Sequence, residues 1–436
     1  MFFKEYLVRQ QKEIKLKSVT GFKNQLLSWS QQFEEIVWLD SNQCIQSHAS
    51  YDAVLAVDAF TGIQTDLNNG FDKLKEYQAA TKDWIFGYLS YDLKNDIEPL
   101  SSQNFDGLGF PDLCFFQPKK LFFFNESTVT IMYLNCVSDE ISPDLIAIES
   151  FSDSTQTTST NDIKIESRIS KASYLEKVKD MLSHIQRGDI YEANFCQEFY
   201  ATSKLDPLHT YFKLNSIALT PFATFFKNGN HFLLSSSPER YLKKEGSTIT
   251  SQPIKGTARR SENTIEDDDL KSVLKSDQKE RSENIMIVDL VRNDLSKIAK
   301  KGSVNVTELC EVHSFRQVHH MISTVEAEAL STLNPIDIIA ATFPMGSMTG
   351  APKISAMKII EALEESKRGV YSGAVGYFSP EGDFDFNVVI RSILYNAYNS
   401  YVSFSVGSAI TSKSIPEKEY EECLVKAKAM RSVLEN

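Results

Sequence analysis

The stretch that decides the fold class is residues 173–187, which read SYLEKVKDMLSHIQR and are followed directly by Gly188. Apolar side chains recur three or four residues apart on one face, at Tyr174, Val178, Met181, Leu182 and Ile185. This spacing predicts an amphipathic helix that ends at the glycine. The segments that follow mix strands and helices without a regular βαβ rhythm. The sequence therefore favours an α+β fold over a doubly wound parallel sheet.

Upstream of this helix, aromatic-rich runs at residues 36–39, 84–89, 120–124 and 128–134 predict strands. A tract of nine polar residues, SDSTQTTST at 152–160, separates the two parts of the chain. Such a tract buries too little apolar surface to offset its ordering entropy, so we expect a linker or an exposed loop. We expect an N-terminal region at 1–150, a linker at 151–165 and a larger region at 166–436, with the two regions intertwined into one body.

The composition is that of an ordinary globular protein: 436 residues, 42% apolar and 24% charged. The 46 basic and 58 acidic residues give a net charge of −12, which argues against nucleic-acid binding because such proteins usually carry a basic surface. No apolar run is long enough to span a bilayer, and the first residues lack the apolar core of a signal peptide. The six cysteines are scattered, which predicts reduced thiols and a cytoplasmic protein.

Two segments offer paired carboxylates. Residues 279–295, KERSENIMIVDLVRNDL, carry Glu280 and Glu283 three residues apart, and residues 419–426, EYEECLVK, carry Glu419, Glu422 and Lys426 on one helical face. Two helices that each present two carboxylates are a plausible way to hold Mg²⁺, which prefers oxygen ligands. Glutamates at this spacing are also common on ordinary helix surfaces, so the spacing alone leaves both interpretations open.

A lysine stands in an unusual context at residues 250–259, TSQPIKGTAR, which follow a strand-like run. Gly256 permits a tight turn and a close approach of a ligand to the backbone. Lys255 can act as a nucleophile if desolvation or a nearby cation lowers its pKa. On this stretch alone, a surface-loop lysine is an equally good interpretation.

A glycine-containing loop at residues 344–353, PMGSMTGAPK, leads into a helical segment at 354–363. Glycines, hydroxyl side chains and a proline near the first turn favour anion binding at a helix N-terminus. A P-loop would require Lys directly after Gly350, so a nucleotide triphosphate site is not supported. Further single candidates are Glu239 in SSPER, the His319–His320 pair, and Arg391.

Taken in order, these motifs resemble the chorismate-utilising enzymes, most closely component I of the aminodeoxychorismate synthases. The resemblance covers nearly the whole chain and is strongest from GDIYEANF at 188–195 to EYEEC at 419–423. The segments WLDS at 38–41 and FGYLSYD at 86–92 fit the same family. The resemblance implies two β-sheets packed against each other and flanked by helices, with a chorismate pocket between the sheets.

The resemblance also implies roles for individual residues. Glu283 and Glu422 are expected to hold Mg²⁺, with Glu280 and Glu419 close behind them, and Glu239 is expected to be the general acid that helps the C4 hydroxyl of chorismate leave. The residues expected to line the substrate pocket are Thr257, His320, Thr349, Arg391, Gly407 and Lys426. The cations among them suit a dianionic substrate that enters an acidic protein.

Lys255 separates the branches of the family. The anthranilate synthases carry a small residue in the Pro-Ile-x-Gly-Thr motif, whereas the aminodeoxychorismate synthases carry a lysine that is proposed to attack C2, so that ammonia arrives at C4. The resemblance therefore implies Mg²⁺-dependent formation of 4-amino-4-deoxychorismate, which feeds 4-aminobenzoate and folate synthesis. The alternatives are an anthranilate synthase component I, an isochorismate or salicylate synthase and, from another class, a ligand-binding relative without activity.

Two positions differ from the family pattern: Glu192 stands where glutamine is usual, and Ala409 where the segment VGSAI at 406–410 usually has glycine. None of the six cysteines lies in the Gly-x-Cys-x-Gly context of a glutaminase. We therefore expect a separate glutamine amidotransferase subunit to deliver ammonia. The sequence leaves open the oligomeric state, the lifetime of that complex and whether an amino acid binds the N-terminal region.

Overall fold

The computed structural model describes residues 8–44, 48–151, 163–316 and 318–435. Its strands are β1 Arg9–Lys15, β2 Glu35–Asp40, β3 Ala53–Thr65, β4 Ile85–Leu89, β5 Leu113–Asn125, β6 Thr128–Leu134, β7 Glu166–Ser167, β8 Glu192–Thr202, β9 Phe222–Asn228, β10 His231–Ser237, β11 Arg240–Glu245, β12 Thr248–Gln252, β13 Ile254–Arg259, β14 Asn305–Ser314, β15 Val318–Glu328, β16 Gly350–Ala351, β17 Ala374–Phe378, β18 Phe384–Val388, β19 Ser392–Asn396 and β20 Tyr401–Thr411. Its helices are α2 Val19–Ser30, α3 Gly70–Thr81, α4 Lys94–Ile97, α5 Ile141–Ser150, α6 Lys171–Arg187, α7 Pro207–Ala218, α8 Thr264–Ser276, α9 Gln278–Ser296, α10 Pro335–Thr342, α11 Lys353–Leu363 and α12 Pro416–Glu435, with short 3₁₀ turns at η1 Tyr91–Leu93, η2 Asn135–Glu140 and η3 Gly346–Met348.

The helix predicted from the apolar spacing is confirmed as α6. It begins two residues earlier than expected because Ser170 caps it, its hydroxyl oxygen accepting a hydrogen bond from the backbone N–H of Ser173 at 3.2 Å. It ends where predicted, since Gly188 takes the left-handed conformation at φ 84°. The four aromatic-rich runs form β2, β4, β5 and β6.

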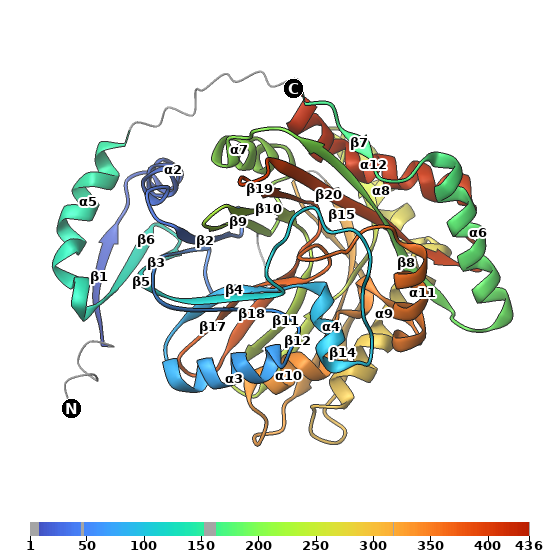
Figure 1. Cartoon of the computed structure of the whole chain (residues 1–436), viewed down its shortest axis with the longest axis horizontal. Coiled ribbons are helices and arrows are strands. Elements are labelled where there is room, and N and C mark those ends of the chain that lie inside the picture. Colours follow the sequence, from blue (N-terminus) through green and yellow to red (C-terminus); the bar gives the residue numbers. More distant parts are fainter. Residues whose placement is uncertain (1–7, 45–47, 152–162, 317, 436) are drawn as a thin grey trace.

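Two sheets share the long strands β3 and β5 (Figure 1). One sheet continues from β3 through β2, β9, β10, β19 and β20 to β8. The other continues from β5 through β4, β17, β18, β11 and β12 to β15, which also pairs with β13 and β14. All of these pairings are antiparallel, which confirms the α+β class.

Each sheet combines strands from both parts of the sequence. β2 pairs with β9, and β4 pairs with β17, so strands from residues 1–150 are hydrogen-bonded to strands from residues 166–436. Most of the expected linker, at 152–162, lies outside the described residues. At its far end, Ile163 and Ile165 are buried in the core.

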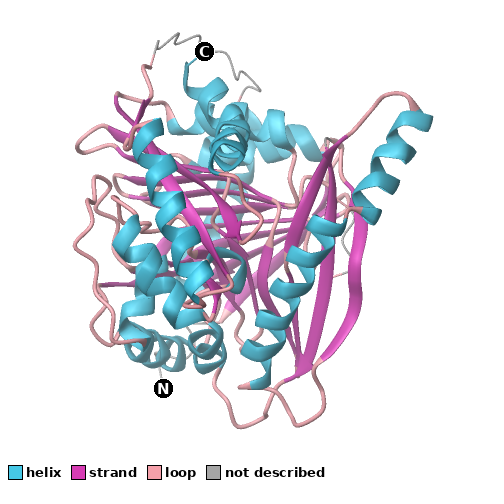
Figure 2. Ribbon diagram, turned by 90° about the vertical axis from the view of Figure 1, so that its right-hand side faces the viewer, coloured by secondary structure: helices cyan, strands magenta, loops and turns pink. Residues whose placement is uncertain are grey.

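Helices pack on the outside of the strands (Figure 2). α9 lies against β13 and β15, and α12 lies against β20 and α7. Each helix buries an apolar stripe, with Ile287, Val291 and Leu295 on α9, and Cys423 and Met430 on α12. Glu283 precedes Ile287 by one helical turn, and Glu419, itself buried, precedes Cys423 by one turn, so the packing of these stripes determines where the carboxylates singled out in the sequence lie.

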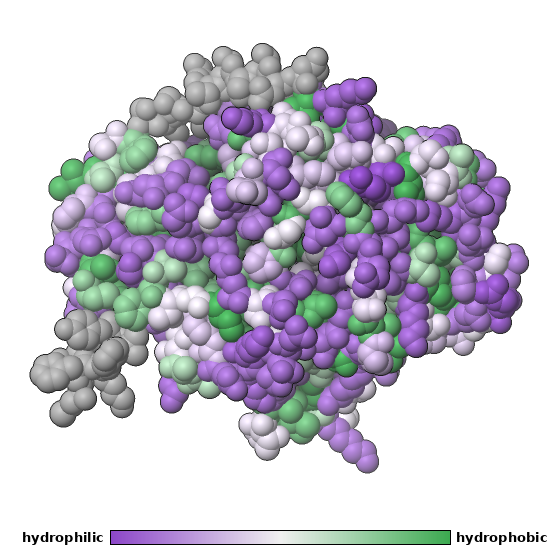
Figure 3. All heavy atoms as spheres, viewed as in Figure 1, coloured by the Kyte–Doolittle hydropathy of each residue, from purple (hydrophilic) through white to green (hydrophobic). Residues whose placement is uncertain are grey.

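The face of the molecule in Figure 3 is mostly hydrophilic, with hydrophobic side chains in small, separate groups. In the described ranges, no helix combines the length and the apolar character needed to cross a membrane. All six cysteines are free, as the sequence predicted.

Candidate active site

Lys255 and Thr257 lie on β13, which runs antiparallel to β15. Thr257 stands opposite His320, and its hydroxyl oxygen is 2.9 Å from His320 Nδ1. Burial, reinforced by the charge of Arg391, lowers the pKa of His320 to about 3. The imidazole is therefore neutral and offers a fixed hydrogen-bonding group next to Lys255.

Gly256, between these two residues, allows β13 to approach α9. Its φ of +88° is a left-handed conformation that favours glycine. A β-carbon at this position would lie 3.2 Å from Glu280 Oε2. The glycine thus brings the backbone beside Lys255 close to the first turn of the helix that carries Glu280 and Glu283.

Glu239 lies in the tight connection between β10 and β11 and is only 5% exposed. Its backbone is fixed on both sides, because its N–H donates to Ser237 Oγ at 3.3 Å and its carbonyl accepts from the N–H of Val388 at 3.0 Å. Burial raises the pKa of Glu239 to about 7, against the opposing charge of Lys255. A carboxyl group that keeps its proton near neutral pH is suited to act as a general acid.

The four glutamates of α9 and α12 face the same region from two helices. Burial raises the pKa of Glu283, and the charges of Glu422 and Glu419 raise it further. Burial and the charge of Glu283 also raise the pKa of Glu280. Glu283 Oε1 is buried without a hydrogen-bond donor among the described residues. The cluster therefore holds more negative charge than its neighbours neutralise.

Lys426 and Arg391 supply positive charge near Glu422. Lys426 Nζ is 2.7 Å from Glu422 Oε1 and donates to the carbonyl of Gly407 at 2.9 Å. Burial alone would raise the pKa of Glu422, but this ion pair lowers it. Arg391 has a left-handed φ of 52°, unusual for a residue with a side chain, and burial lowers the pKa of its guanidinium.

The loop at residues 344–353 packs against β8 and α9. Gly350 has no room for a side chain, because a β-carbon there would lie 2.2 Å from the carbonyl oxygen of Glu192. Lys353 Nζ donates to Asp294 Oδ2 on α9 at 2.5 Å and to the carbonyl of Pro344 at 2.7 Å. Lys353 was not among the residues predicted to have a role, and in the structure it links this loop to α9.

Thr349 is the one predicted pocket residue whose side chain is already used within its own turn. Its hydroxyl donates to the carbonyls of Met345 and Gly346, both at 3.2 Å, and the residue is fully buried. Its carbonyl accepts a hydrogen bond from the N–H of Asn194 at 2.7 Å. Through these bonds Thr349 holds the loop against β8.

The two positions that differ from the family pattern lie on the paired strands β8 and β20. Glu192 is 2% exposed, and its Oε2 has no hydrogen-bond partner among the described residues. Burial raises the pKa of Glu192, as does the charge of Glu283, while the charge of Lys255 opposes the shift. Ala409 stands opposite Asn194 and shares one face of β20 with Gly407.

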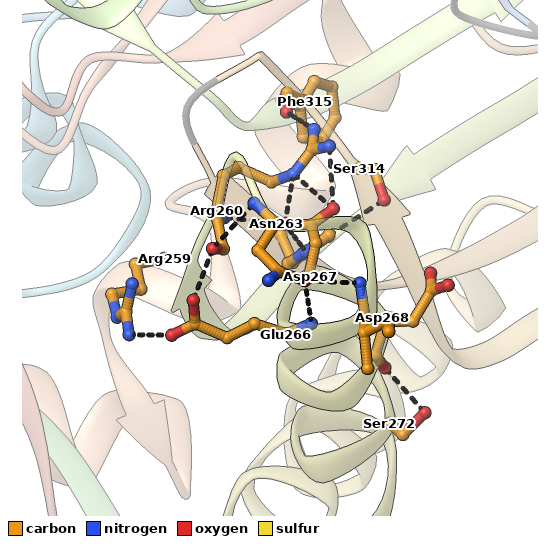
Figure 4. A network of polar contacts seen from close by, with 12 residues as sticks. Arg259, Arg260, Asn263, Glu266, Asp267, Asp268, Ser272, Ser314 and Phe315 are labelled. Atoms are coloured by element: carbon orange, nitrogen blue, oxygen red, sulfur yellow. Dashed lines mark hydrogen bonds and ion pairs between the residues drawn. The ribbon is translucent and has the colours of Figure 1, made fainter.

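A polar network secures the connection between β13 and α8 (Figure 4). Arg260 binds both oxygens of Asp267 and donates to the carbonyl of Phe315 at 2.5 Å. His319, which is buried, lies between Ser314 Oγ at 2.9 Å and Asp267 Oδ1 at 3.1 Å. Sequence reasoning missed this network because its members come from three separate segments. It fixes the strand end beside Thr257 and His320.

These groups form one site around Lys255. The charge of Lys255 opposes the rise in pKa that burial causes in carboxyl groups from four different elements: Glu192 of β8, Glu239 of the β10–β11 connection, Glu283 of α9 and Glu422 of α12. The charge of Arg391 helps to lower the pKa of His320, and the charge of Glu422 on α12 acts in turn on the pKa of Arg391. In the described part of the chain, no three His, Cys, Asp or Glu side chains already form a metal-binding group.

A second cavity lies between β2, β3 and β11, and its lining includes Asp40, Tyr51, Arg240, Asp385 and Asn387. Arg240 directly follows Glu239, so the two sites are neighbours along the chain. The charged groups of the cavity are paired: Arg240 Nε donates to Asp385 at 3.0 Å, and Lys23 Nζ donates to Asp40 at 2.8 Å.

A family model described as chorismate binding enzyme matches residues 25–432. The chain is 43% identical over 270 residues to the probable aminodeoxychorismate synthase, chloroplastic, of Oryza sativa subsp. japonica, a match that covers 61% of this chain and 30% of the rice protein. It is 30% identical over 387 residues to aminodeoxychorismate synthase component 1 of Bacillus subtilis (strain 168), covering 86% and 80% of the two chains.

The fold is similar to that of a solved structure, anthranilate synthase component I from Streptococcus pneumoniae TIGR4. The TM-score is 0.77 at 26% identity, with 89% of this chain and 93% of that chain covered. This likeness confirms the expected anthranilate synthase component I-like fold. The chain spans less than a third of the length of the rice relative but most of the length of the two bacterial proteins.

Proposed function

The chain belongs to the chorismate binding enzymes, whose family model matches residues 25–432, and from that membership we propose that it aminates chorismate at C4 to give 4-amino-4-deoxychorismate. The observation that carries this proposal is the position of Lys255 among Glu192, Glu239, Glu283 and Glu422. A lysine in that position can attack the ring, and a protonated carboxyl group lies close enough to influence it. The names of the rice and B. subtilis relatives support the same reaction.

In the proposed reaction, the free amine of Lys255 forms a bond to C2 of chorismate, the two conjugated ring double bonds shift, and the C4 hydroxyl leaves as water. Glu239 supplies the proton for that water, which its pKa of about 7 permits. Ammonia then forms a bond to C4, the double bonds shift back, and the Lys255 amine leaves C2. The new C4 ammonium gives one proton back to Glu239, so Lys255, Glu239 and the ring are restored and the net change is amine for hydroxyl.

Substrate binding falls to the cationic and neutral groups around Lys255. Arg391 and Lys426 would attract the two carboxylates of chorismate. Thr257 and the neutral His320 would orient the substrate by hydrogen bonds, because their mutual contact of 2.9 Å fixes both side chains. The Gly407 carbonyl holds Lys426 in place.

Mg²⁺ fits the carboxylates of α9 and α12. Glu283 Oε1 is buried and accepts no hydrogen bond from the described residues, and burial, together with the charges of neighbouring glutamates, raises the pKa values of Glu280 and Glu283. Glu283 and Glu422 would hold the ion, with Glu280 and Glu419 close behind and the remaining positions left to water and substrate. When bound, Mg²⁺ would neutralise the substrate carboxylate at C1.

The ammonia would come from a separate glutamine amidotransferase subunit, because no cysteine of this chain lies in a Gly-x-Cys-x-Gly segment. The name "component 1" of the B. subtilis relative fits a two-component enzyme. We place the reaction in the cytoplasm, which suits six free cysteines.

The test is to incubate the purified chain with chorismate, Mg²⁺ and ammonium at mildly alkaline pH and to resolve the products by chromatography and mass. We expect a product that retains the enolpyruvyl group and carries an amine in place of a hydroxyl. Anthranilate, isochorismate or salicylate would instead assign the chain to another branch of the family. Mg²⁺-dependent binding of chorismate by calorimetry, without any product, would indicate a relative without activity.

A further inference from the structure

Lys279 lies in the first turn of α9, beside the carboxylates proposed as metal ligands. Asp277 Oδ1 caps this turn by accepting hydrogen bonds from the N–H groups of Lys279 at 2.8 Å and Glu280 at 2.9 Å. The Lys279 ammonium lies 3.7 Å from Glu283 Oε1, one helical turn further along. At that distance the two groups form an ion pair without a hydrogen bond.

The Lys279 ammonium is influenced by both helices. Burial would lower the pKa of Lys279, but the charges of Glu283, Glu419, Glu422 and Glu280 raise it above its usual value. Two of these carboxylates belong to α9 and two belong to α12. Glu283 and Glu422, the two proposed Mg²⁺ ligands, therefore both act on this ammonium, which lies within ion-pair distance of Glu283.

The other nearby cations, Lys426 and Lys255, also interact with groups outside the four carboxylates. Lys426 is bound to Glu422 and to the Gly407 carbonyl. Lys255 lies deeper, where its charge also acts on Glu192 and Glu239. The Lys279 side chain is 48% exposed, whereas that of Lys426 is 30% exposed. It can therefore move into water without opening the core.

We propose that the Lys279 ammonium is an internal counterion, which holds the α9 and α12 carboxylates together in the metal-free protein and leaves them when Mg²⁺ binds. An exposed ion pair of this length contributes little free energy, so the ammonium is readily displaced. A divalent cation gains more, because it binds carboxylate oxygens of both helices directly. The inference rests on the proposed Mg²⁺ site and adds a residue that sets its affinity.

Removing the ammonium should therefore strengthen Mg²⁺ binding. Lys279→Met keeps most of the stem and removes the charge. In calorimetric titrations of the full chain with MgCl₂ alone, we expect its Kd to be roughly fivefold lower than that of the wild type, which is the size of one exposed ion pair. Titration with Mn²⁺, followed by electron paramagnetic resonance, should give the same ranking.

Lys275→Met is the matched control, because the Lys275 ammonium pairs with Glu311 at 2.8 Å on the exposed surface of neighbouring α8. Its Kd for Mg²⁺ should stay within about twofold of the wild type, since an exposed charge that is paired with Glu311 is largely screened from the α9 and α12 carboxylates. In EDTA, the K279M variant should melt below the wild type, because four carboxylates lose their counterion. Mg²⁺ should then raise its melting temperature more than that of the wild type.

Unchanged or weaker Mg²⁺ binding by the K279M variant would overturn the counterion role while leaving the proposed reaction intact. Glu283→Gln separates the two proposals. If this variant binds Mg²⁺ as tightly as the wild type, the metal site itself is wrongly assigned, and the proposed function loses its metal as well. Neither measurement depends on turnover of chorismate.

Discussion

Glu239 and Arg240 are consecutive residues at the boundary of two regions, the candidate active site around Lys255 and the cavity between β2, β3 and β11, and these regions differ in how their charges are satisfied. On the Lys255 side, the buried atoms that make no hydrogen bond within the described residues include carboxylate oxygens of Glu192 and Glu283. In the cavity, Arg240 is paired with Asp385, and the buried atoms without a hydrogen bond in the described part of the chain belong to neutral groups, such as Ser41 Oγ and Asn387 Nδ2.

The difference indicates which of the two regions is suited to catalysis. An unpaired buried charge costs far more free energy than an unpaired hydroxyl or amide. The candidate active site carries part of that cost, because Glu192 Oε2 has no hydrogen-bond partner among the described residues. Substitution of the buried acid Glu239 should therefore remove activity without loss of stability, whereas substitution of the paired charges in the cavity should lower stability and leave the rate unchanged.

Lys255→Ala should have the largest effect on activity. We expect the rate of chorismate amination with ammonium to fall by more than about 10³-fold, because the variant lacks the group that attacks C2. The melting temperature should also fall, because the buried carboxyl groups of Glu192, Glu239, Glu283 and Glu422 lose a nearby positive charge, so the rate is compared per folded molecule. The control is Lys244→Ala, which removes a lysine of β11 that is paired with Asp383. Full activity in Lys255→Ala would rule out the covalent-lysine mechanism.

Glu239→Gln should lower the rate by about 100-fold or more, which is the usual contribution of a general acid. At a fixed concentration of free ammonia, the wild-type rate should fall as pH rises through about 7, where Glu239 loses its proton. In the variant this limb of the pH profile should disappear. Glu245→Gln, a largely exposed position on β11, should retain it.

The same substitution should stabilise the protein in alkali. The unfolded carboxyl loses its proton near pH 4.5 and the folded one near 7, so the free energy of unfolding of the wild type falls as pH rises between these values. Above pH 7 the variant should be more stable by up to about 3 kcal/mol. Denaturant titrations at pH 5 and pH 8 measure the difference. Equal stabilities at pH 8 would contradict the proposed burial of an ionisable Glu239.

Asp385→Asn tests the other pocket. It leaves the Arg240 guanidinium, whose side chain is 1% exposed, without its carboxylate. We expect a loss of about 3 kcal/mol in the free energy of unfolding, because half of a buried ion pair is removed. The rate per folded molecule should stay within about twofold of the wild type. A loss of rate as large as that of Glu239→Gln would show that the two pockets are not independent.

Ala409→Gly should have the smallest effect. It removes a methyl group from the face of β20 that also carries Gly407, where a substrate carboxylate would approach the backbone. We expect the KM for chorismate to fall by roughly two- to threefold, with kcat unchanged. Ser408→Ala, a buried position on the opposite face of the same strand, should leave KM unchanged. A raised KM in Ala409→Gly would mean that the methyl group helps to hold the substrate.

Local patterns predicted the individual elements well. The helix predicted from the apolar spacing at 173–187 was confirmed as α6, and the aromatic-rich runs were confirmed as strands. These predictions succeed because a helix stripe or an alternating strand is determined within a few residues. Pairings such as β4 with β17 were not predictable in the same way, because their residues lie far apart and neither strand encodes its partner.

The candidate site shows the same limit. The motifs identified Lys255, Glu239 and the paired glutamates, but Lys279 received no role, although its i,i+4 spacing to Glu283 was a visible signal. The contact between Asp267 and His319 had no signal in the sequence, because it depends on how β15 meets α8. Likewise, only the fold shows that Glu192 has an oxygen without a partner.

The pairing of β4 with β17 has a consequence for how the chain is made. When the ribosome has synthesised β4, the strand that covers one of its edges is still about 290 residues from being added. At roughly 5–20 residues per second, that interval lasts about 15–60 s. During this time one edge of the apolar strand β4 is open to other chains. Nascent-chain chaperones should therefore bind after residue 85 has been added and before residue 374 is, and slower translation should increase aggregation.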